Sequence, residues 1–199
     1  MLPTLLQLVL DHEASPNMGQ PCACNVPNAK RTIRCYDCQF YETSCSDCFI
    51  KFHAYLPTHW AEVWDSDRGF FIRHDIATLK PDISSINLGH AGLPCPSRHA
   101  TNLIFHVIDM NGIHATKIRF CMCRGNPNRV EQLMHARLFP ATISQPTTAF
   151  TFQVLRQFHI HHLESKESAY DFIGSLRRLT DNAFPQRVAV CSSCCFLIL

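Results

Sequence analysis

The sequence has no long hydrophobic run and little net charge. No segment approaches the roughly 18 consecutive apolar residues that a membrane-spanning helix needs, so we expect no membrane partner. Leu5–Leu10 is a short apolar run that contains Gln7 and has no Lys or Arg before it, which is unlike a secretory signal peptide. The formal net charge is +2, and no block of five like charges occurs. The chain as a whole is therefore not a polycation of the kind that binds nucleic acid through charge alone.

Motifs that indicate common enzyme classes are also missing. The sequence contains no His-Glu-x-x-His metalloprotease motif, no phosphate-binding loop and no Gly-x-Ser-x-Gly nucleophile motif. Its aspartates are scattered, and no spacing pairs them into a two-metal carboxylate site. We therefore predict that the chain is not an enzyme and takes no small-molecule substrate.

Cysteine and histidine are abundant instead, with 12 of each. Eight of them stand in order between residues 22 and 59, namely Cys22, Cys24, Cys35, Cys38, Cys45, Cys48, His53 and His59. A structural zinc ion takes four such ligands, so eight ligands complete two sites. In the usual interleaved arrangement, the first and third pairs bind one ion, and the second and fourth pairs bind the other. We call this segment the ligand ladder and expect its folding to depend on zinc, because so short a segment buries little core.

Two alternatives apply to the ladder. The cysteines could form disulfides, but about 6% cysteine is below the density typical of secreted disulfide scaffolds. The missing signal peptide also favours reduced thiols and a nuclear or cytoplasmic location. Separately, only one residue lies between Cys22 and Cys24, whereas two are usual. One member of that pair could therefore be a bystander.

A second group of ligands predicts a third zinc site. His90 and Cys95 lie in a loop rich in glycine and proline, and Cys121 and Cys123 follow the second strand of a predicted hairpin. Three cysteines and one histidine make an ordinary closed structural site. His114, inside the hairpin, is an alternative nitrogen ligand.

Apolar periodicity and turn signals indicate a mixed fold. Asn111-Gly112 stands between the strand patterns 103–109 and 113–120 and predicts a β-hairpin, because both turn positions favour positive φ. Further short strands are expected at 32–35 and 39–41. Helices are expected at 2–13, 45–54, 129–137, 149–163 with Thr148 as the N-cap, and 168–179. The tract His159–His162 is expected to be a solvated last helical turn rather than a metal site.

We therefore predict an α+β protein with a crossed-brace zinc module, an antiparallel hairpin region and a helical C-terminal part. The expected segments are an N-terminal helix and linker (1–21), the zinc module (22–60), a β-rich region with the third zinc site (61–127), a helical region (128–182) and an atypical tail (183–199).

Several short motifs resemble those of one known family. They are Leu88-Gly89-His90, Cys95-Pro96, Val107-Ile108-Asp109, Gly112-Ile113-His114, Phe120-Cys121-x-Cys123, Gln132-Leu133, Leu138-Phe139-Pro140-Ala141-Thr142, Thr148-Ala149-Phe150-Thr151-Phe152, Ser165-Lys166, Tyr170-Asp171-Phe172 and Leu179-Thr180-Asp181-Asn182. Together with the ladder, they extend over residues 22–182, about four fifths of the chain. On these residues the chain resembles the Cys-x-Cys cluster domain associated with Kyakuja-Dileera-Zisupton (KDZ) transposases of mushroom-forming fungi.

The resemblance implies a domain that precedes a transposase region with acidic catalytic residues. This sequence ends before such a region, and the resemblance ends after Asn182, so we expect a truncated or mis-spliced product. The tail is not a prenylation box, because Cys195 stands fifth from the end.

The family context implies DNA or chromatin as the partner of this transposase-derived chain. Lys30, Arg31, Arg34 and Lys51 of the ladder segment could contact phosphates. The alternative is a protein–protein interaction module, because the crossed ladder is similar to ZZ-type and B-box-type zinc fingers, which often bind peptides. We therefore predict a non-catalytic zinc-binding domain that binds DNA or chromatin, with the protein–protein interaction module as the alternative.

Overall fold

The computed structural model describes residues 2–14, 17–39, 42–80, 85–97, 99, 102–123, 125 and 128–189. The chain divides into two compact units, Met1–Leu79 and Lys80–Leu199, which are described one at a time. Within the described part, no helix is both long enough and apolar enough to cross a membrane. Most of the strand expected at 39–41 lies outside the described residues. The cysteine-containing end of the tail, 190–199, lies outside them entirely.

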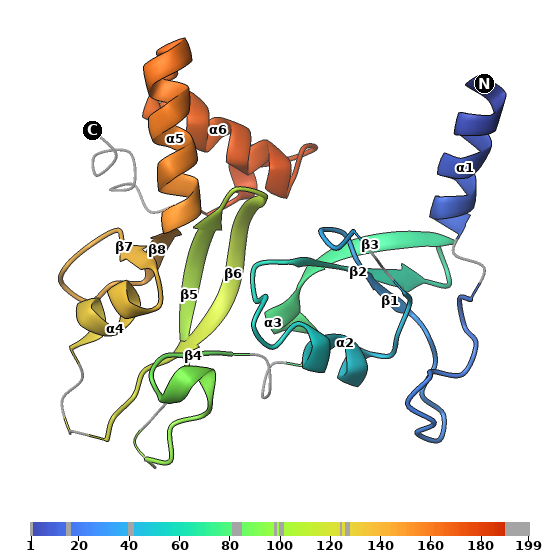
Figure 1. The fold of residues 1–199 in the computed structure, drawn as a ribbon, viewed down its shortest axis with the longest axis horizontal. Helices are drawn as coiled ribbons and strands as arrows, with labels where there is room; N and C mark the ends of the chain where they lie inside the picture. Colours follow the sequence, from blue (N-terminus) through green and yellow to red (C-terminus); the bar gives the residue numbers. More distant parts are fainter. Residues whose placement is uncertain are drawn as a thin grey trace. The chain divides into compact units, whose positions relative to one another are not determined.

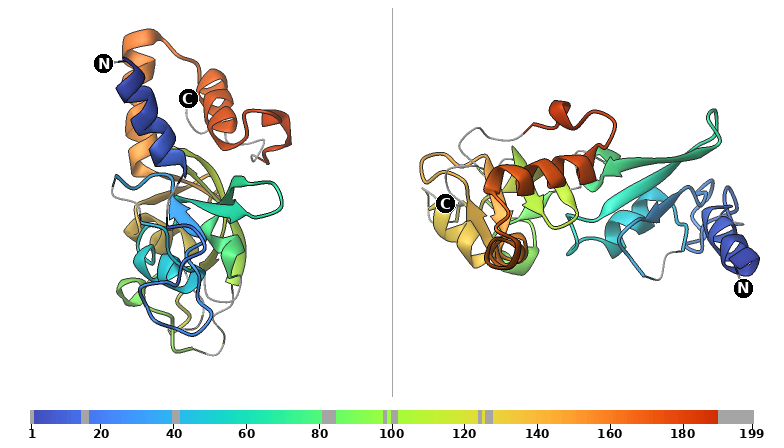
Figure 2. Two further views of the ribbon diagram at one scale, coloured as in Figure 1. Left: turned by 90° about the vertical axis from the view of Figure 1, so that its right-hand side faces the viewer. Right: turned by 90° about the horizontal axis from the view of Figure 1, so that it is seen from above.

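In the first unit, a helix precedes a small antiparallel sheet. The elements in chain order are α1 (Leu2–Ala14), β1 (Ile33–Cys35), α2 (Ser46–Phe52), β2 (Trp60–Asp65), β3 (Phe70–Asp75) and α3 (Ile76–Leu79). β1 pairs with β2, and β2 pairs with β3 over its whole length, forming the hairpin ribbon seen in Figure 2. A small core joins the sheet to α2 and α3 and consists of Ile33, Cys35, Phe49, Ala61 and Ile76.

This pairing places the domain boundary later than we predicted. We expected the zinc module to end at residue 60, but β2 and β3 lie in the first unit, which ends at Leu79. The physical reason is that the three-residue β1 and the ladder loops bury little surface alone. Ala61 of β2 pairs with Cys35 of β1 and is fully buried, so β2 supplies the missing core.

Arg34 of β1, one of the four basic residues that could contact phosphates, is buried. Its guanidinium donates to Glu62 Oε2 at 2.6 Å and to Glu13 Oε2 at 2.8 Å. Its guanidinium carbon also lies 4.0 Å from the centre of the Phe71 ring. Since Glu13 belongs to α1 and Glu62 to β2, this side chain connects three elements and is not exposed to a nucleic acid.

The second unit is built on a five-stranded mixed sheet (Figure 1). Its strands are ordered β4-β6-β5-β8-β7, where β4 is Ile86–Asn87, β5 is Asn102–Asp109, β6 is Gly112–Arg119, β7 is Leu138–Pro140 and β8 is Thr148–Thr151. β5 and β6 form the predicted antiparallel hairpin. β8 pairs in parallel with β5, β4 pairs in parallel with β6, and β7 pairs antiparallel with β8.

The hairpin turn lies one residue earlier than we predicted. Met110 and Asn111 form the turn, and Gly112 pairs with Asp109 as the first residue of β6. Neither turn residue has positive φ, whereas Gly112 has a φ of 141°. The backbone N–H of Met110 donates to Asp109 Oδ1 at 2.8 Å and stabilises the turn.

Among its described residues, the second unit also contains three α-helices and two short 3₁₀ helices. They are α4 (Arg129–His135), α5 (Phe152–Ser165), α6 (Ala169–Thr180), η1 (His90–Gly92) and η2 (Pro185–Arg187). We predicted that Thr148 caps a helix starting at residue 149, but the N-cap is Thr151, which accepts from the Val154 N–H at 3.2 Å. Residues 148–151 form β8 instead, because Phe150 is almost fully buried in the sheet. The region predicted to be helical therefore also contains β7 and β8.

Each face of this sheet carries its own core. Ile108 of β5 packs with α5 and α6 through residues such as Phe158. Val107, its neighbour in the strand, faces the opposite side and shares a cluster with Leu133 of α4. Phe120 belongs to the same hydrophobic core as Val107 and Leu133, so the chain is anchored immediately before Cys121.

Candidate metal centres

The twelve cysteine and histidine residues singled out in the sequence form three groups of four. The groups are Cys22, Cys24, Cys45 and Cys48; Cys35, Cys38, His53 and His59; and His90, Cys95, Cys121 and Cys123. We call them the first, second and third clusters. In each cluster the ligand atoms lie within 4.8 Å of one another. The grouping is the crossed one predicted for the ladder, and both Cys22 and Cys24 take part.

A tetrahedral metal site provides a standard for these separations. With Zn–S bonds of about 2.3 Å and Zn–N bonds of about 2.0 Å, two sulfurs are about 3.8 Å apart, and a sulfur and a nitrogen are about 3.5 Å apart. Two sulfurs joined in a disulfide would be only about 2.05 Å apart. The distances therefore distinguish a metal site from a disulfide.

The first cluster matches this standard closely. The sulfurs of Cys22 and Cys48 are 3.9 Å apart, and those of Cys24 and Cys45 are 3.8 Å apart. Cys45 is the N-cap of α2 and Cys48 lies in its first turn, so the helix fixes the positions of these two cysteines. The first pair lies on a tight loop in which the Cys22 N–H donates to the Ala29 carbonyl at 2.8 Å.

The second cluster combines two sulfurs with two imidazoles. Cys35 Sγ lies 3.3 Å from His59 Nδ1, and Cys38 Sγ lies 3.5 Å from both His59 Nδ1 and His53 Nε2. Cys35 ends β1, His53 follows the last turn of α2, and His59 directly precedes β2. Three elements that share one small core thus deliver the four ligands.

The orientation of His53 is fixed by its second nitrogen. His53 Nδ1 lies 2.9 Å from the Phe49 carbonyl oxygen, and because a carbonyl only accepts, Nδ1 carries the proton. The imidazole also stacks on the Phe49 ring, with 4.1 Å between ring centres. Burial lowers the pKa of His53 below its usual 6.5. These contacts favour a neutral ring that presents Nε2 as a ligand.

The third cluster is more exposed than the other two. Cys95 Sγ lies 3.9 Å from Cys121 Sγ and 3.6 Å from Cys123 Sγ. His90 Nε2 lies 3.2 Å and 3.3 Å from the sulfurs of Cys121 and Cys123. The nitrogen in this cluster therefore comes from His90, not from the alternative His114, whose buried ring lies 2.9 Å from Asn111 Oδ1.

Two residues that are not ligands hold the third cluster together. Gly89 has a φ of 85°, and a Cβ added there would lie 2.9 Å from the Cys121 Cβ. Gln132 of α4 binds the backbone of Cys121 on both sides, as acceptor from its N–H at 2.7 Å and as donor to its carbonyl at 3.0 Å. The glycine-rich loop is visible in the sequence, but the role of Gln132 is not, because an amide that binds backbone has no characteristic spacing.

The thiols of the clusters do not share one pKa. Hydrogen bonds from backbone N–H groups lower the pKa of Cys22 and of Cys95 to about 6. Burial raises the pKa of Cys35 and of Cys48 to about 12, and contacts with the neighbouring thiols raise that of Cys123 to about 11. Thiolates crowded at these distances repel one another, and a divalent cation at the centre would remove that repulsion.

The remaining histidine tract does not form such a centre among the described residues. His161 Nδ1 lies 2.9 Å from Glu167 Oε2, and His162 Nδ1 lies 3.0 Å from the Glu167 carbonyl oxygen. Both histidines are exposed near the end of α5, as the sequence predicted.

Comparison with known proteins places the chain in one family. A family model described as a CxC2-like cysteine cluster associated with KDZ transposases matches residues 82–184, slightly more than half of the chain. This segment contains the whole third cluster, whereas the first and second clusters lie outside it. The match is therefore narrower than the resemblance drawn from the sequence, which began at Cys22. No curated protein and no solved structure matches the chain. On the evidence of the matched segment, the chain belongs to the family of CxC2-like cysteine cluster domains associated with KDZ transposases.

Proposed function

We propose that the chain is a zinc-stabilised binding domain in which all three clusters hold structural zinc ions. The supporting observation is that each cluster brings four ligand atoms together, with sulfur and nitrogen separations close to those of a tetrahedral site. Zinc suits these donors, because nine of the twelve ligands are cysteines and three are histidines. Binding would convert short loops with little core into folded structure.

We further propose that the domain is not catalytic. A catalytic zinc ion usually has three protein ligands and one open position for water or substrate. Each of the three clusters offers four protein ligands, so a tetrahedral ion would have no position left for an activated water molecule. The domain would then act by binding a partner.

A protein is the partner that we propose first. Of the four ladder residues considered for DNA phosphates, Arg34 is buried in ion pairs. Arg31 donates to the carbonyl oxygens of Pro21 and Thr43 and is only slightly exposed. Because these two cations already contact protein groups, DNA binding to this unit would release fewer counterions.

DNA or chromatin is the second candidate. Lys30 and Lys51 are exposed, and the family is associated with transposases. Two lysines on a small unit support weak, salt-sensitive binding to a DNA duplex. A titration with a short duplex at two salt concentrations distinguishes the candidates, because tight binding with a steep salt dependence would put DNA first.

Native mass spectrometry tests the zinc proposal directly. We expect three zinc ions per chain, and chelation is expected to unfold the ladder. Cys38→Ser should lose one ion, whereas Cys191→Ser, outside the described residues, should keep all three. A purified chain without zinc, or equal zinc loss in the two variants, would contradict the proposal.

A nuclease assay tests the absence of catalysis. The chain should neither cut nor join DNA in the presence of magnesium or manganese. Metal-dependent cleavage that is abolished by Asp109→Asn or Asp171→Asn would overturn the non-catalytic proposal.

A further inference from the structure

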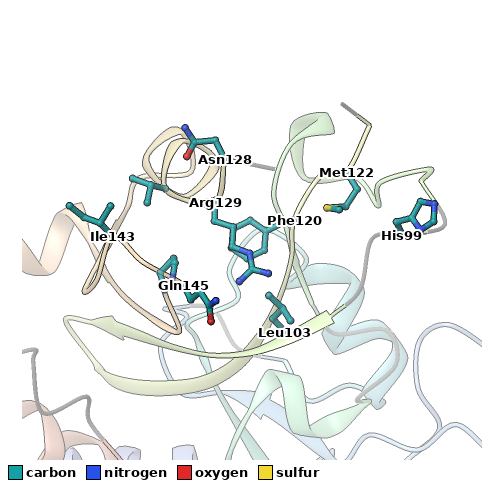
Figure 3. Close-up of a pocket in the computed structure, with 10 residues that line it drawn as sticks. His99, Leu103, Phe120, Met122, Asn128, Arg129, Ile143 and Gln145 are labelled. Carbon is teal, nitrogen blue, oxygen red and sulfur yellow. The ribbon is translucent and has the colours of Figure 1, made fainter. Parts of the chain in front are cut away.

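The second unit contains a cavity of about 480 Å³, and Figure 3 shows residues that line it. Its volume falls in the range that accommodates a small ligand or a few side chains. Phe120 and Met122 line it, and they are the two sequence neighbours of Cys121. The backbone that carries the third cluster therefore also shapes the cavity.

The lining combines an apolar surface with one strong positive charge. Leu103 and Val130 contribute apolar surface, and Ile143, which also lines the cavity, is 85% exposed. No aspartate or glutamate is among the described residues that line the cavity. An apolar side chain as exposed as Ile143 gains by contact with an apolar partner.

Arg129 supplies the charge. Its guanidinium extends into the cavity in Figure 3, and its guanidinium carbon lies 5.5 Å from the centre of the Phe120 ring. Arg129 is only partly exposed, and within the described part of the chain no carboxylate pairs with it. A partly desolvated guanidinium without an acidic partner binds an incoming carboxylate more strongly than a fully hydrated one does.

We propose that this cavity binds a peptide segment of a protein partner in which an acidic residue stands beside an apolar one. The carboxylate would pair with Arg129, and the apolar side chain would pack near Ile143 and Leu103. Asn128 would assist, because its side-chain oxygen accepts from the Glu131 N–H at 3.1 Å and its amide N–H groups can serve as donors. This proposal deepens the proposed function and rests on its choice of a protein partner.

The same lining fits single-stranded nucleic acid less well. Base stacking needs an exposed aromatic face, but Phe120 is only 3% exposed. Backbone recognition needs several cations along a groove, whereas the described lining contains Arg129 and the histidine His99. Charge complementarity and apolar contact therefore favour an acidic–apolar peptide.

Fluorescence anisotropy with a labelled peptide tests whether the cavity binds an acidic–apolar segment. The zinc-loaded full chain is titrated with a labelled peptide GSLELESG and with its uncharged control GSLQLQSG. We expect the acidic peptide to bind at least about tenfold more tightly than the control. Arg129→Gln should remove this preference. Arg178→Gln, which changes an exposed arginine of α6, should leave it intact.

Nuclear magnetic resonance locates the bound peptide and shows whether the variant is folded. The acidic peptide should shift the Arg129 Nε–H and Ile143 methyl signals, and the Arg129→Gln spectrum should otherwise remain that of the folded chain. Arg129→Lys keeps the charge and should retain part of the preference. Equal binding of the two peptides, or equal effects of Arg129→Gln and Arg178→Gln, overturns the proposal, as does Arg129-dependent binding of single-stranded DNA without peptide binding.

The zinc content of the same sample separates this proposal from the previous one. Three zinc ions without preference for the acidic peptide would reject the cavity proposal and leave the zinc proposal standing. A chain without zinc that still prefers the acidic peptide through Arg129 would reject the zinc proposal and support the cavity.

Discussion

Gln132 and Cys121 are joined by two hydrogen bonds between one side-chain amide and the backbone N–H and carbonyl of one residue. Gln132 Oε1 accepts from the Cys121 N–H at 2.7 Å, and Gln132 Nε2 donates to the Cys121 carbonyl at 3.0 Å. Because α4 carries Gln132, the helix fixes the backbone that presents a ligand of the third cluster. Such supporting contacts orient ligands that would otherwise move.

Gln132→Glu should weaken zinc binding at the third cluster. A carboxylate can accept from the Cys121 N–H but cannot donate to its carbonyl, so half of the contact is lost. We expect the third ion to bind about tenfold more weakly while the ladder keeps its two ions. Competition with a chromophoric chelator measures this, and Gln153→Glu on the exposed side of α5 is the matched control. Equal affinities in the two variants would show that the contact does not support the cluster.

Gly89→Ala should disrupt the third cluster by a steric clash. The residue has a φ of 85° and a ψ of 179°, a conformation that is essentially restricted to glycine and costs another residue about 1–3 kcal/mol. The added Cβ would also lie 2.9 Å from the Cys121 Cβ, so a ligand must move. Gly125→Ala isolates the first effect, because Gly125 has a φ of 84° and nothing within 4 Å of an added Cβ. Native mass spectrometry should find two ions in Gly89→Ala and three in Gly125→Ala, and three ions in both would refute the steric argument.

The residues of the three candidate metal sites could be singled out from the sequence because each consists of pairs whose spacing is local. Pairs such as Cys35 and Cys38 are set by one short turn, and their grouping follows from the order of the pairs. Gln132 could not be predicted, since its contact with Cys121 depends on where α4 packs. The burial of Arg34 could not be predicted for a related reason: a charged residue is expected at the surface unless its partners, here Glu13 and Glu62, are known.

How well a strand could be predicted depends on how far along the sequence its partner strand lies. The β5–β6 hairpin is local and was predicted within one residue at the ends of both strands. β8 was predicted to be the start of a helix, because residues 148–151 lead into an amphipathic pattern and their pairing with β5 crosses about 40 residues of sequence. Non-local parallel pairing leaves no mark in a short sequence window.

Arg34→Met should destabilise the first unit strongly. The change leaves the Glu62 carboxylate, whose side chain is only 14% exposed, without its buried partner. Breaking such a pair costs about 3 kcal/mol. Glu13→Gln should cost less than about 1 kcal/mol, because Glu13 is 61% exposed.

Tryptophan fluorescence in a urea titration measures these effects. Both tryptophans, Trp60 and Trp64, lie in the first unit, so the signal reports that unit alone. Lys51→Met changes an exposed cation of the same unit and should alter the free energy of unfolding by less than about 0.5 kcal/mol. If Arg34→Met behaves like Lys51→Met, the ion pairs around Arg34 do not stabilise the fold.

Acid should destabilise the first unit through His53. Burial lowers the pKa of His53 in the folded state below the 6.5 of an unfolded histidine, so the unfolded state binds more protons below that pH. The stabilisation is complete above about pH 6.5 and is lost as the pH falls through the folded-state pKa. Protons also compete with zinc for the imidazole and the thiolates, which acts in the same direction. Between about pH 7.5 and pH 5.5, on either side of the ordinary histidine pKa, the urea midpoint reported by tryptophan fluorescence should fall and zinc should be released. A midpoint that stays constant or rises over this interval would mean that His53 neither gains a proton on unfolding nor serves as a ligand.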